Sequence, residues 1–211
     1  MKKPISEISI RRWILYYRYL NELLQQERTK VLSEEIAQYF NLDPSQVRKD
    51  FSYIGQLGKR GCGYNVEKLL FDLKKKIRQS QKMEVVLVGC GKLGRALIGY
   101  PILQKFNFVV SRGFDIDKKI IGKTVENVPI DSYEKLEEYI QNNKITMAII
   151  AVPSASAKSV FTDLVSMGVQ GILNFSPVFL HAGDNKVIVK NVDFSIDFNV
   201  LRYQLGERRI K

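Results

Sequence analysis

The feature that most constrains the fold is a glycine fingerprint placed between a buried strand and a helix. The apolar, β-branched run Met83–Val88 leads directly into Gly89-Cys90-Gly91-Lys92-Leu93-Gly94, and a helical pattern follows from Ala96. A G-x-G-x-x-G motif alone is weakly informative, but between a strand and a helix it predicts a Rossmann dinucleotide-binding unit. Its glycines permit a tight turn and a close approach of the backbone to a pyrophosphate, which would rest on the helix N-terminus.

An acidic residue follows at the spacing typical of this unit. A second strand, about Phe108–Phe114, ends in Asp115, which stands 21 positions after Gly94. A carboxylate at this place accepts hydrogen bonds from the adenosine ribose and repels a 2′-phosphate. The sequence therefore predicts NAD(H), rather than NADP(H), as the cofactor.

Strands and helices continue to alternate downstream, which predicts an α/β fold with a doubly wound parallel sheet. The expected elements are a helix over 132–142, a strand over 145–152, a helix over 156–167 and strands over 171–175 and 187–189. Ligands of such sheets bind beyond the carboxyl ends of the strands. We therefore expect four further residues beside the nicotinamide: Val152, Pro153, Asn174 and Phe175.

The final segment, about 193–209, carries Phe194, Phe198, Leu201 and Leu205 at helical spacing. An apolar stripe that follows a complete Rossmann unit needs a surface to cover it. That surface is either the segment's own domain or a second subunit.

The first 80 residues predict a different module, which is basic and helical. They carry 16 Lys and Arg against 9 Asp and Glu, a charge of +7 within the total of +11. Such an excess suits a polyanionic partner, although a basic solvated surface gives the same count. Helices are predicted from 9 to 26, after an N-cap at Ser33, and from an Asp43-Pro44 start signal. A linker-like helix from Val66 to about Ser80 ends the module.

The second and third of these helices have the spacing of a helix-turn-helix. In the third helix Val47, Phe51 and Ile54 share the core face. The other faces carry the side chains that we expect to contact DNA, namely Ser45, Gln46, Arg48, Lys49, Ser52 and Tyr53. Arg and Lys suit guanine, and Gln suits adenine, in the major groove. A solvated helix face would show similar residues, so this pattern alone leaves both readings open.

A glycine-rich turn after the third helix favours the DNA-binding interpretation. Residues 55–64 place four glycines around the adjacent cations Lys59 and Arg60. Glycines at that density indicate a tight hairpin tip, and a basic tip beside a recognition helix is typical of a winged helix whose wing enters the minor groove. An ordinary basic hairpin is the alternative. We therefore expect three parts: 1–80 as a winged helix-turn-helix, 81–192 as a Rossmann domain and 193–211 as a C-terminal helix.

Over nearly its whole length the chain resembles the Rex family of redox-sensing repressors. The most specific matches are Gln46-Val47-Arg48-Lys49-Asp50-Phe51-Ser52-Tyr53 and Gly58-Lys59-Arg60-Gly61-Cys62-Gly63-Tyr64. Supporting matches are the fingerprint Gly89–Gly94, Tyr100-Pro101, Phe114–Asp117, Ile172–Pro177 and Asn191–Asp193. Cys62 departs from the family, which usually shows an aliphatic residue there, and we expect only local effects.

The resemblance implies a transcriptional repressor that works as a homodimer with swapped C-terminal helices. Such a dimer occupies a palindromic operator when NADH is scarce and leaves it when NADH binds. By position, Arg18 and Asp193 form an ion pair in the DNA-competent state, and Tyr100 takes over Asp193 in the NADH state. Phe194 of the partner subunit lines the nicotinamide pocket. An apolar pocket also disfavours the cationic ring of NAD⁺, so we expect NADH to be the preferred effector.

Three alternatives compete with this interpretation. A dehydrogenase needs a positioned acid or base, but the sole histidine, His181, lies in a polar turn and Tyr64-x-x-x-Lys68 precedes the Rossmann segment. A DNA-binding sensor of another nucleotide, such as coenzyme A, is disfavoured by Asp115. A thiol switch at Cys90 is less expected than a small packing residue. Neither a signal peptide nor a membrane-spanning run is found, so we expect a cytoplasmic protein that does not bind membranes.

Overall fold

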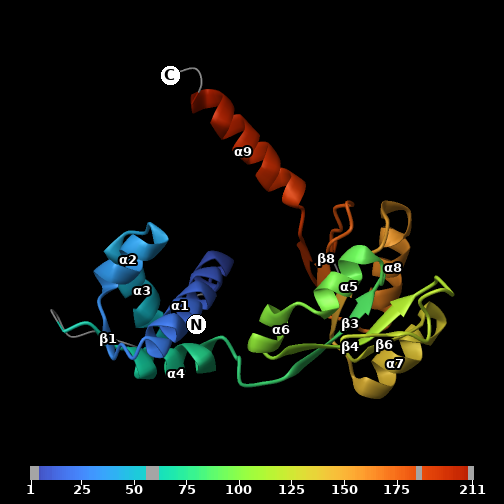
Figure 1. The fold of residues 1–211 in the computed structure, drawn as a ribbon, viewed down its shortest axis with the longest axis horizontal. Coiled ribbons are helices and arrows are strands. Elements are labelled where there is room, and N and C mark those ends of the chain that lie inside the picture. Colours follow the sequence, from blue (N-terminus) through green and yellow to red (C-terminus); the bar gives the residue numbers. More distant parts are fainter. Residues whose placement is uncertain (1–4, 56–61, 184–186, 209–211) are drawn as a thin grey trace. The chain divides into compact units, whose positions relative to one another are not determined.

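The computed structural model describes residues 5–55, 62–183 and 187–208, which divide into two compact units, 1–81 and 82–211. Figure 1 gives the element labels. None of the helices within these described ranges is both long and apolar enough to cross a membrane. Each unit has its own hydrophobic core and is described separately below.

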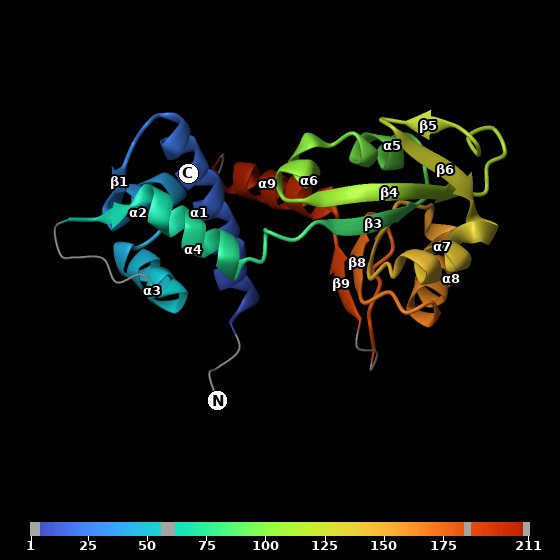
Figure 2. The same cartoon turned by 90° about the horizontal axis from the view of Figure 1, so that it is seen from below.

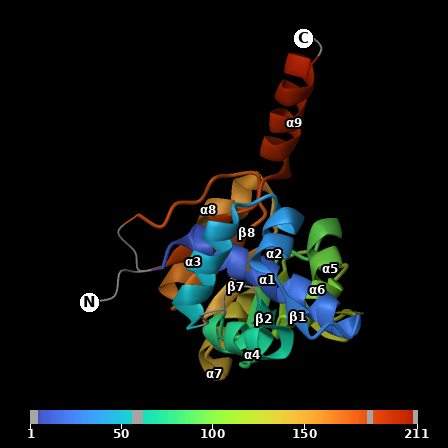
Figure 3. The same cartoon turned by 90° about the vertical axis from the view of Figure 1, so that its left-hand side faces the viewer.

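In its described residues, the first unit consists of four helices and a short β-ribbon. The helices are α1 (Glu7–Gln25), α2 (Ser33–Phe40), α3 (Pro44–Ile54) and α4 (Val66–Lys76), of which the first three are blue to cyan in Figure 3. Strands β1 (Lys30–Val31) and β2 (Tyr64–Asn65) pair antiparallel. The order of helices, turn and ribbon is that of a winged helix, as predicted.

The core of the first unit is built from the helix faces that the sequence pattern indicates. Val47 and Phe51 of α3 are fully buried, and the Phe51 ring meets those of Tyr16 and Tyr64 edge to face. Asp43 caps α3 by accepting a hydrogen bond from the Ser45 N–H at 2.7 Å, as predicted. The predicted cap of α2 was wrong by one residue: Leu32 is the N-cap, and its N–H is bound by the Glu35 carboxylate at 3.0 Å.

The second unit is built on a seven-stranded sheet with the order β5-β6-β4-β3-β7-β8-β9. Its strands are β3 (Met83–Val88), β4 (Phe108–Asp115), β5 (Thr124–Val125), β6 (Val128–Ser132), β7 (Met147–Ile150), β8 (Gly171–Asn174) and β9 (Ile188–Asn191). All neighbours pair in parallel except the edge hairpin β5–β6. The predicted doubly wound sheet is therefore present, with one antiparallel hairpin that the sequence analysis missed.

That hairpin has weak sequence signals. Its turn residues Glu126 and Asn127 both adopt positive φ, as in a two-residue type I′ turn. Glutamate is unusual at such a position, and β5 is only two residues long. Two residues are too few to show the alternation of apolar and polar side chains that predicts a strand.

Helices cover both faces of the sheet, as Figure 2 shows. Helices α7 (Leu136–Asn143) and α8 (Ser154–Ser166) pack on Val86 and Val88 of β3. Helices α5 (Lys92–Ile98) and α6 (Pro101–Lys105) pack on the opposite face, against Val85 and Leu87. This alternation places the carboxyl end of β3 at the centre of the unit.

The last helix, α9 (Phe194–Arg208), is apolar on two sides rather than one. Every side chain from 194 to 206 is exposed, so the helix does not pack on its own domain. At 100° per residue, the predicted stripe of Phe194, Phe198, Leu201 and Leu205 lies opposite a second one of Ile196, Val200 and Tyr203. A helix with two opposed apolar faces requires cover on both.

Candidate functional site

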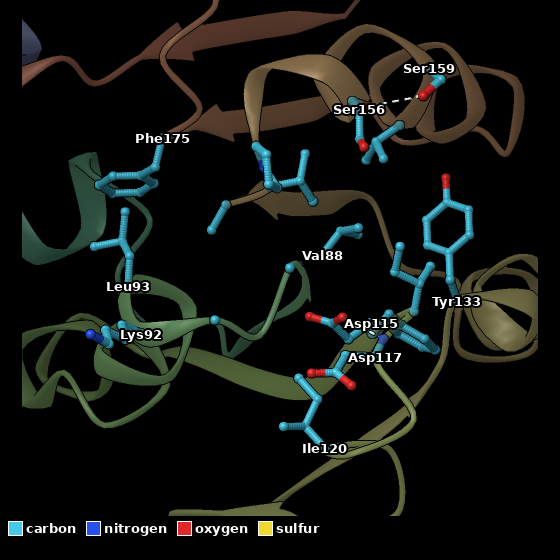
Figure 4. Close-up of a pocket in the computed structure, with 18 of the residues that line it drawn as sticks. Val88, Lys92, Leu93, Asp115, Asp117, Ile120, Tyr133, Ser156, Ser159 and Phe175 are labelled. Carbon is cyan, nitrogen blue, oxygen red and sulfur yellow. Dashed lines mark hydrogen bonds between the residues drawn. The ribbon is translucent and has the colours of Figure 1, made fainter.

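A cleft of about 690 Å³ opens where β3, β4 and β7 end. This volume lies within the range typical of small-molecule sites. Eight predicted cofactor-binding residues line the cleft: Gly89, Gly91, Lys92, Leu93, Asp115, Val152, Pro153 and Phe175. Figure 4 shows the cleft from Leu93 and Phe175 at one end to Tyr133 at the other.

Each glycine of the fingerprint is explained by a different structural feature. Gly89 has φ +93°, and a Cβ there would lie 2.6 Å from the Ala151 carbonyl oxygen. A Cβ on Gly94 would lie 2.0 Å from the Gly89 oxygen, so the helix and the turn could not pack. Gly91 differs, because a Cβ there meets nothing within 4 Å. The open space at Gly91 faces the cleft and leaves room for a pyrophosphate against the loop.

Asp115 is held at the cleft by two backbone donors. Its Oδ2 accepts from the Cys90 N–H at 2.6 Å, and its Oδ1 accepts from the Asp117 N–H at 2.9 Å. A carboxylate oxygen accepts two hydrogen bonds, so each still has capacity for a ribose hydroxyl. The residues present therefore fit an adenine dinucleotide with a free 2′-hydroxyl.

Replacing Asp115 with alanine is expected to weaken NADH binding about 10- to 100-fold. The reason is the loss of hydrogen bonds to a charged group, worth roughly 1.5–3 kcal/mol. Isothermal titration calorimetry measures the effect. Glu138→Gln, which removes an exposed carboxylate of α7 outside the cleft, is the matched control. Equal affinities for wild-type protein and Asp115→Ala would contradict the assignment.

The two ends of the cleft differ in chemistry. Leu93 and Phe175 supply apolar surface at one end (Figure 4). At the other end the Tyr133 hydroxyl donates to Asp163 at 2.7 Å, and burial together with this contact raises the Tyr133 pKa. Tyr133 was not predicted from the sequence because it follows β6, a strand that was itself not predicted. Other lining residues outside the predicted set include Ile116, Asp117, Ile120, Ser156, Ser159 and Pro177.

Five predicted cofactor residues do not line the cleft: Cys90, Gly94, Tyr100, Asn174 and Phe194. Asn174 is a correction, since its buried amide donates to the Val178 oxygen and to Asn191 and accepts from Ser176. It fixes the turn after β8 and has no group free for a nicotinamide. Tyr100 is exposed at the start of α6, and the Phe194 ring lies 6.5 Å from that of Phe175 of the same chain.

Cys90 holds Asp115 through its backbone N–H and buries its side chain. The thiol is fully buried and donates to the Phe114 oxygen at 3.7 Å. Burial, with the nearby Asp115 carboxylate, raises the pKa of the Cys90 thiol to about 12. A thiol switch needs an accessible thiolate, so this alternative has no support in the geometry.

Thiol alkylation is expected to distinguish the two cysteines. Cys62 is exposed and Cys90 is buried. Iodoacetamide at pH 7.5 should therefore alkylate Cys62 in the folded protein. The alkylation rate of Cys90 should be at least about 100-fold lower, because the reactive form is the thiolate. Peptide mass spectrometry reads both sites, and alkylation after unfolding is the control. Comparable rates at the two cysteines in folded protein would contradict the burial argument.

Helix α3 exposes most of the residues that we predicted to contact DNA. Ser45, Lys49, Ser52 and Tyr53 are exposed, and Gln46 is half-buried. The exposed Arg48 is paired with Glu34 of α2 at 3.1 Å and donates to the Ser33 hydroxyl. Surface pairs of this kind contribute at most about 1 kcal/mol, so a phosphate or a guanine can replace Glu34.

Four other predicted residues remain outside these two sites. Lys59 and Arg60 of the wing lie outside the described residues. Arg18 is exposed on α1, in the first unit, and Asp193 stands at the start of α9, in the second. The Ser195 hydroxyl and N–H lower the Asp193 pKa, so this group is a carboxylate at neutral pH. The Arg18–Asp193 pairing stays a prediction.

Two family models match the chain in the order of its two units. A model described as a putative DNA-binding protein N-terminus covers residues 4–52, and one described as a CoA binding domain covers residues 80–178. The redox-sensing transcriptional repressor Rex of an Exiguobacterium species is 41% identical over 199 residues, or 94% of this chain and 91% of that protein. The chain belongs to the Rex family of redox-sensing transcriptional repressors.

Solved structures of the Rex family match almost the whole chain. The crystal structure of RSP, a Rex-family repressor, with β-NAD⁺ and operator DNA has a TM-score of 0.91 and 32% identity over 99% of this chain and 96% of that one. The complex of RSP with β-NADH gives 0.87 over 99% and 98%. The expectation of a regulator rather than a dehydrogenase is confirmed by this membership.

Proposed function

We propose that this chain represses transcription by binding a palindromic operator as a homodimer, and that NADH releases it. The carrying observation is full-length similarity to a repressor that was crystallised with operator DNA and β-NAD⁺, combined with the geometry of Asp115. We assign operator contact to 1–80, cofactor binding to 81–192 and the subunit swap to 193–211. The wing cations Lys59 and Arg60 belong to the first assignment, and the site of action is the cytoplasm.

The choice of NADH as effector rests on the apolar end of the cleft. Leu93 and Phe175 offer no counter-charge to an oxidised nicotinamide ring. Burial of an unpaired cation is costly, so this end favours the neutral reduced ring. We also place the partner's Phe194 beside that ring, since the Phe194 of this chain is exposed and available for exchange.

The dimer assignment rests on α9. Two apolar faces without cover in a single chain favour insertion of the helix between surfaces of a second copy. In that arrangement we assign Arg18 and Asp193 to an ion pair of the DNA-bound state, and Tyr100 to Asp193 in the NADH-bound state. The exposure of Tyr100 and the charge of Asp193 suit these roles.

Selection of duplexes from a random pool, with and without NADH, tests this function. The wild-type protein should enrich a palindrome whose half-sites lie one helical turn apart, roughly 34–36 Å. Addition of NADH should abolish that enrichment. A pool that remains random without NADH would refute operator binding.

Competition calorimetry tests the cofactor assignment against coenzyme A, which one family model names. Coenzyme A carries a phosphate on its ribose, and the Asp115 carboxylate repels it. NADH should therefore bind more tightly than coenzyme A and NADPH. Tighter binding of coenzyme A would favour a sensor of that nucleotide instead.

A further inference from the structure

A buried carboxylate lies directly beneath the DNA-facing surface of α3. Asp50 is fully inaccessible to solvent. It lies one helical turn after Gln46, which is half-buried. An unpaired carboxylate at such a place costs several kcal/mol, so its partners decide whether the helix is stable. Asp50 plays no part in the site described above.

Four donors surround this carboxylate. Arg12 of α1 binds both oxygens, with Nη2 to Oδ1 at 2.8 Å and Nε to Oδ2 at 2.5 Å. The Tyr16 hydroxyl donates to Oδ2 at 3.0 Å, and the Gln46 amide donates from Nε2 to Oδ1 at 3.0 Å. Each oxygen thus accepts two hydrogen bonds, and among the described residues the Arg12 guanidinium is the cation paired with this carboxylate.

The contact with Asp50 sets which way the Gln46 amide points. An ionised carboxylate only accepts hydrogen bonds, so the amide must turn its NH₂ group toward Oδ1. In the part of the chain that the structure describes, the Gln46 Oε1 has no hydrogen-bond partner. One acceptor and one remaining N–H are therefore available together at the helix surface.

We infer that Asp50 is a specificity-determining positioning residue, which holds Gln46 in the orientation that recognises adenine in the major groove. Adenine presents an N6–H donor and an N7 acceptor, which match the free Oε1 and the second Nε2–H of Gln46. If the amide reversed, its Oε1 would meet the Asp50 carboxylate. The reversed orientation is excluded by repulsion. The inference rests on the proposed function, because it requires α3 to lie in the groove.

The Asp50→Asn variant tests the inference in the full-length protein. When the asparagine NH₂ group takes the place of Oδ1, the Gln46 amide is free to reverse and to present two donors, which suit guanine. The probe is the duplex selected by the wild-type protein, with each base pair changed in turn. Wild type should lose about tenfold or more in affinity when the adenine read by Gln46 is replaced by guanine. Asp50→Asn should lose less than about threefold at that position and should keep the other preferences.

Further variants separate positioning from stability. Gln46→Ala should abolish the preference at the same base pair, and adding Asp50→Asn to it should change nothing there. Tyr16→Phe removes a donor to Oδ2 but leaves the Gln46 contact, so it should lower the melting temperature without altering base preference. Glu67→Gln, on the exposed face of α4, is the control for charge. Should Asp50→Asn fail to fold, Asp50→Glu keeps the charge, displaces the acceptor and should give the same loss of preference.

The outcomes of these experiments test the role of Asp50 separately from the proposed function. A wild-type protein that selects no sequence refutes operator binding. A wild-type protein that selects a palindrome, together with an Asp50→Asn variant whose base-pair penalties are unchanged, overturns the positioning role alone. If Asp50→Asn and Gln46→Ala both lose the preference at the same base pair of each half-site, the positioning role of Asp50 is established.

Discussion

Saturating NADH is expected to lower operator affinity by at least about 100-fold, whereas NAD⁺ at equal concentration should lower it less than about threefold. The reason is differential binding: a shift of the dimer from 99:1 to 1:99 requires about 5.5 kcal/mol, which two cofactors per dimer share. The apolar end of the cleft makes that difference, because it accepts a neutral ring and disfavours a cation. Gel-shift or fluorescence anisotropy titration on the selected palindrome measures it.

The Asp115→Ala protein is the control for this titration, because it should bind DNA normally and respond to NADH only at 10- to 100-fold higher concentration. That result would separate the cofactor response from non-specific effects of the dinucleotide on DNA. Equal weakening by NADH and NAD⁺ would reject discrimination by ring charge. A complex that persists at saturating NADH would reject release altogether.

The second large effect is expected from removal of α9. A chain that ends at Asp193 should be monomeric, and its operator affinity should fall by about 10³. Two linked reading heads gain roughly 10² to 10⁴ in avidity over one, and that gain disappears with the dimer. Sedimentation equilibrium reports the oligomeric state, and anisotropy on the palindrome reports the affinity.

Point variants on α9 refine this test. Aspartate at Leu201 or at Ile196 places a charge on one or the other of the opposed apolar faces, and both should dissociate the dimer if both faces are covered. Arg202→Gln, which lies between the faces, is the control and should remain dimeric. A truncated chain that stays dimeric would contradict the swap.

Much of this molecule could be predicted because its strongest signals are local. Gly89 and Gly94 lie within one strand–turn–helix, and Asp115 follows at the spacing that is typical of the unit, so the motif predicts all three. The cap at Asp43 and the core positions of α3 are equally local. Local sequence signals of this kind can be recognised without knowing which elements meet in space.

The sequence could not show contacts between distant segments. Asp50 is charged, and residues of this type are usually exposed. It is buried here because the fold brings Arg12, which is 38 residues away in the sequence, against it. Asn174 follows the rule for strand ends, yet Asn191 of β9 and the Val178 carbonyl use up its amide. Tyr133 depends on β6, whose pairing with β4 is not visible in its own residues.

The sealed thiol of Cys90 has a physiological consequence. A sulfur atom in the very loop that would hold the cofactor could make a redox regulator answer to peroxide as well as to fuel metabolism. Because this thiol is buried and burial raises its pKa, the thiolate that reacts with oxidants is disfavoured at Cys90. Peroxide is therefore expected to act first at the exposed Cys62 rather than at the loop that holds Asp115.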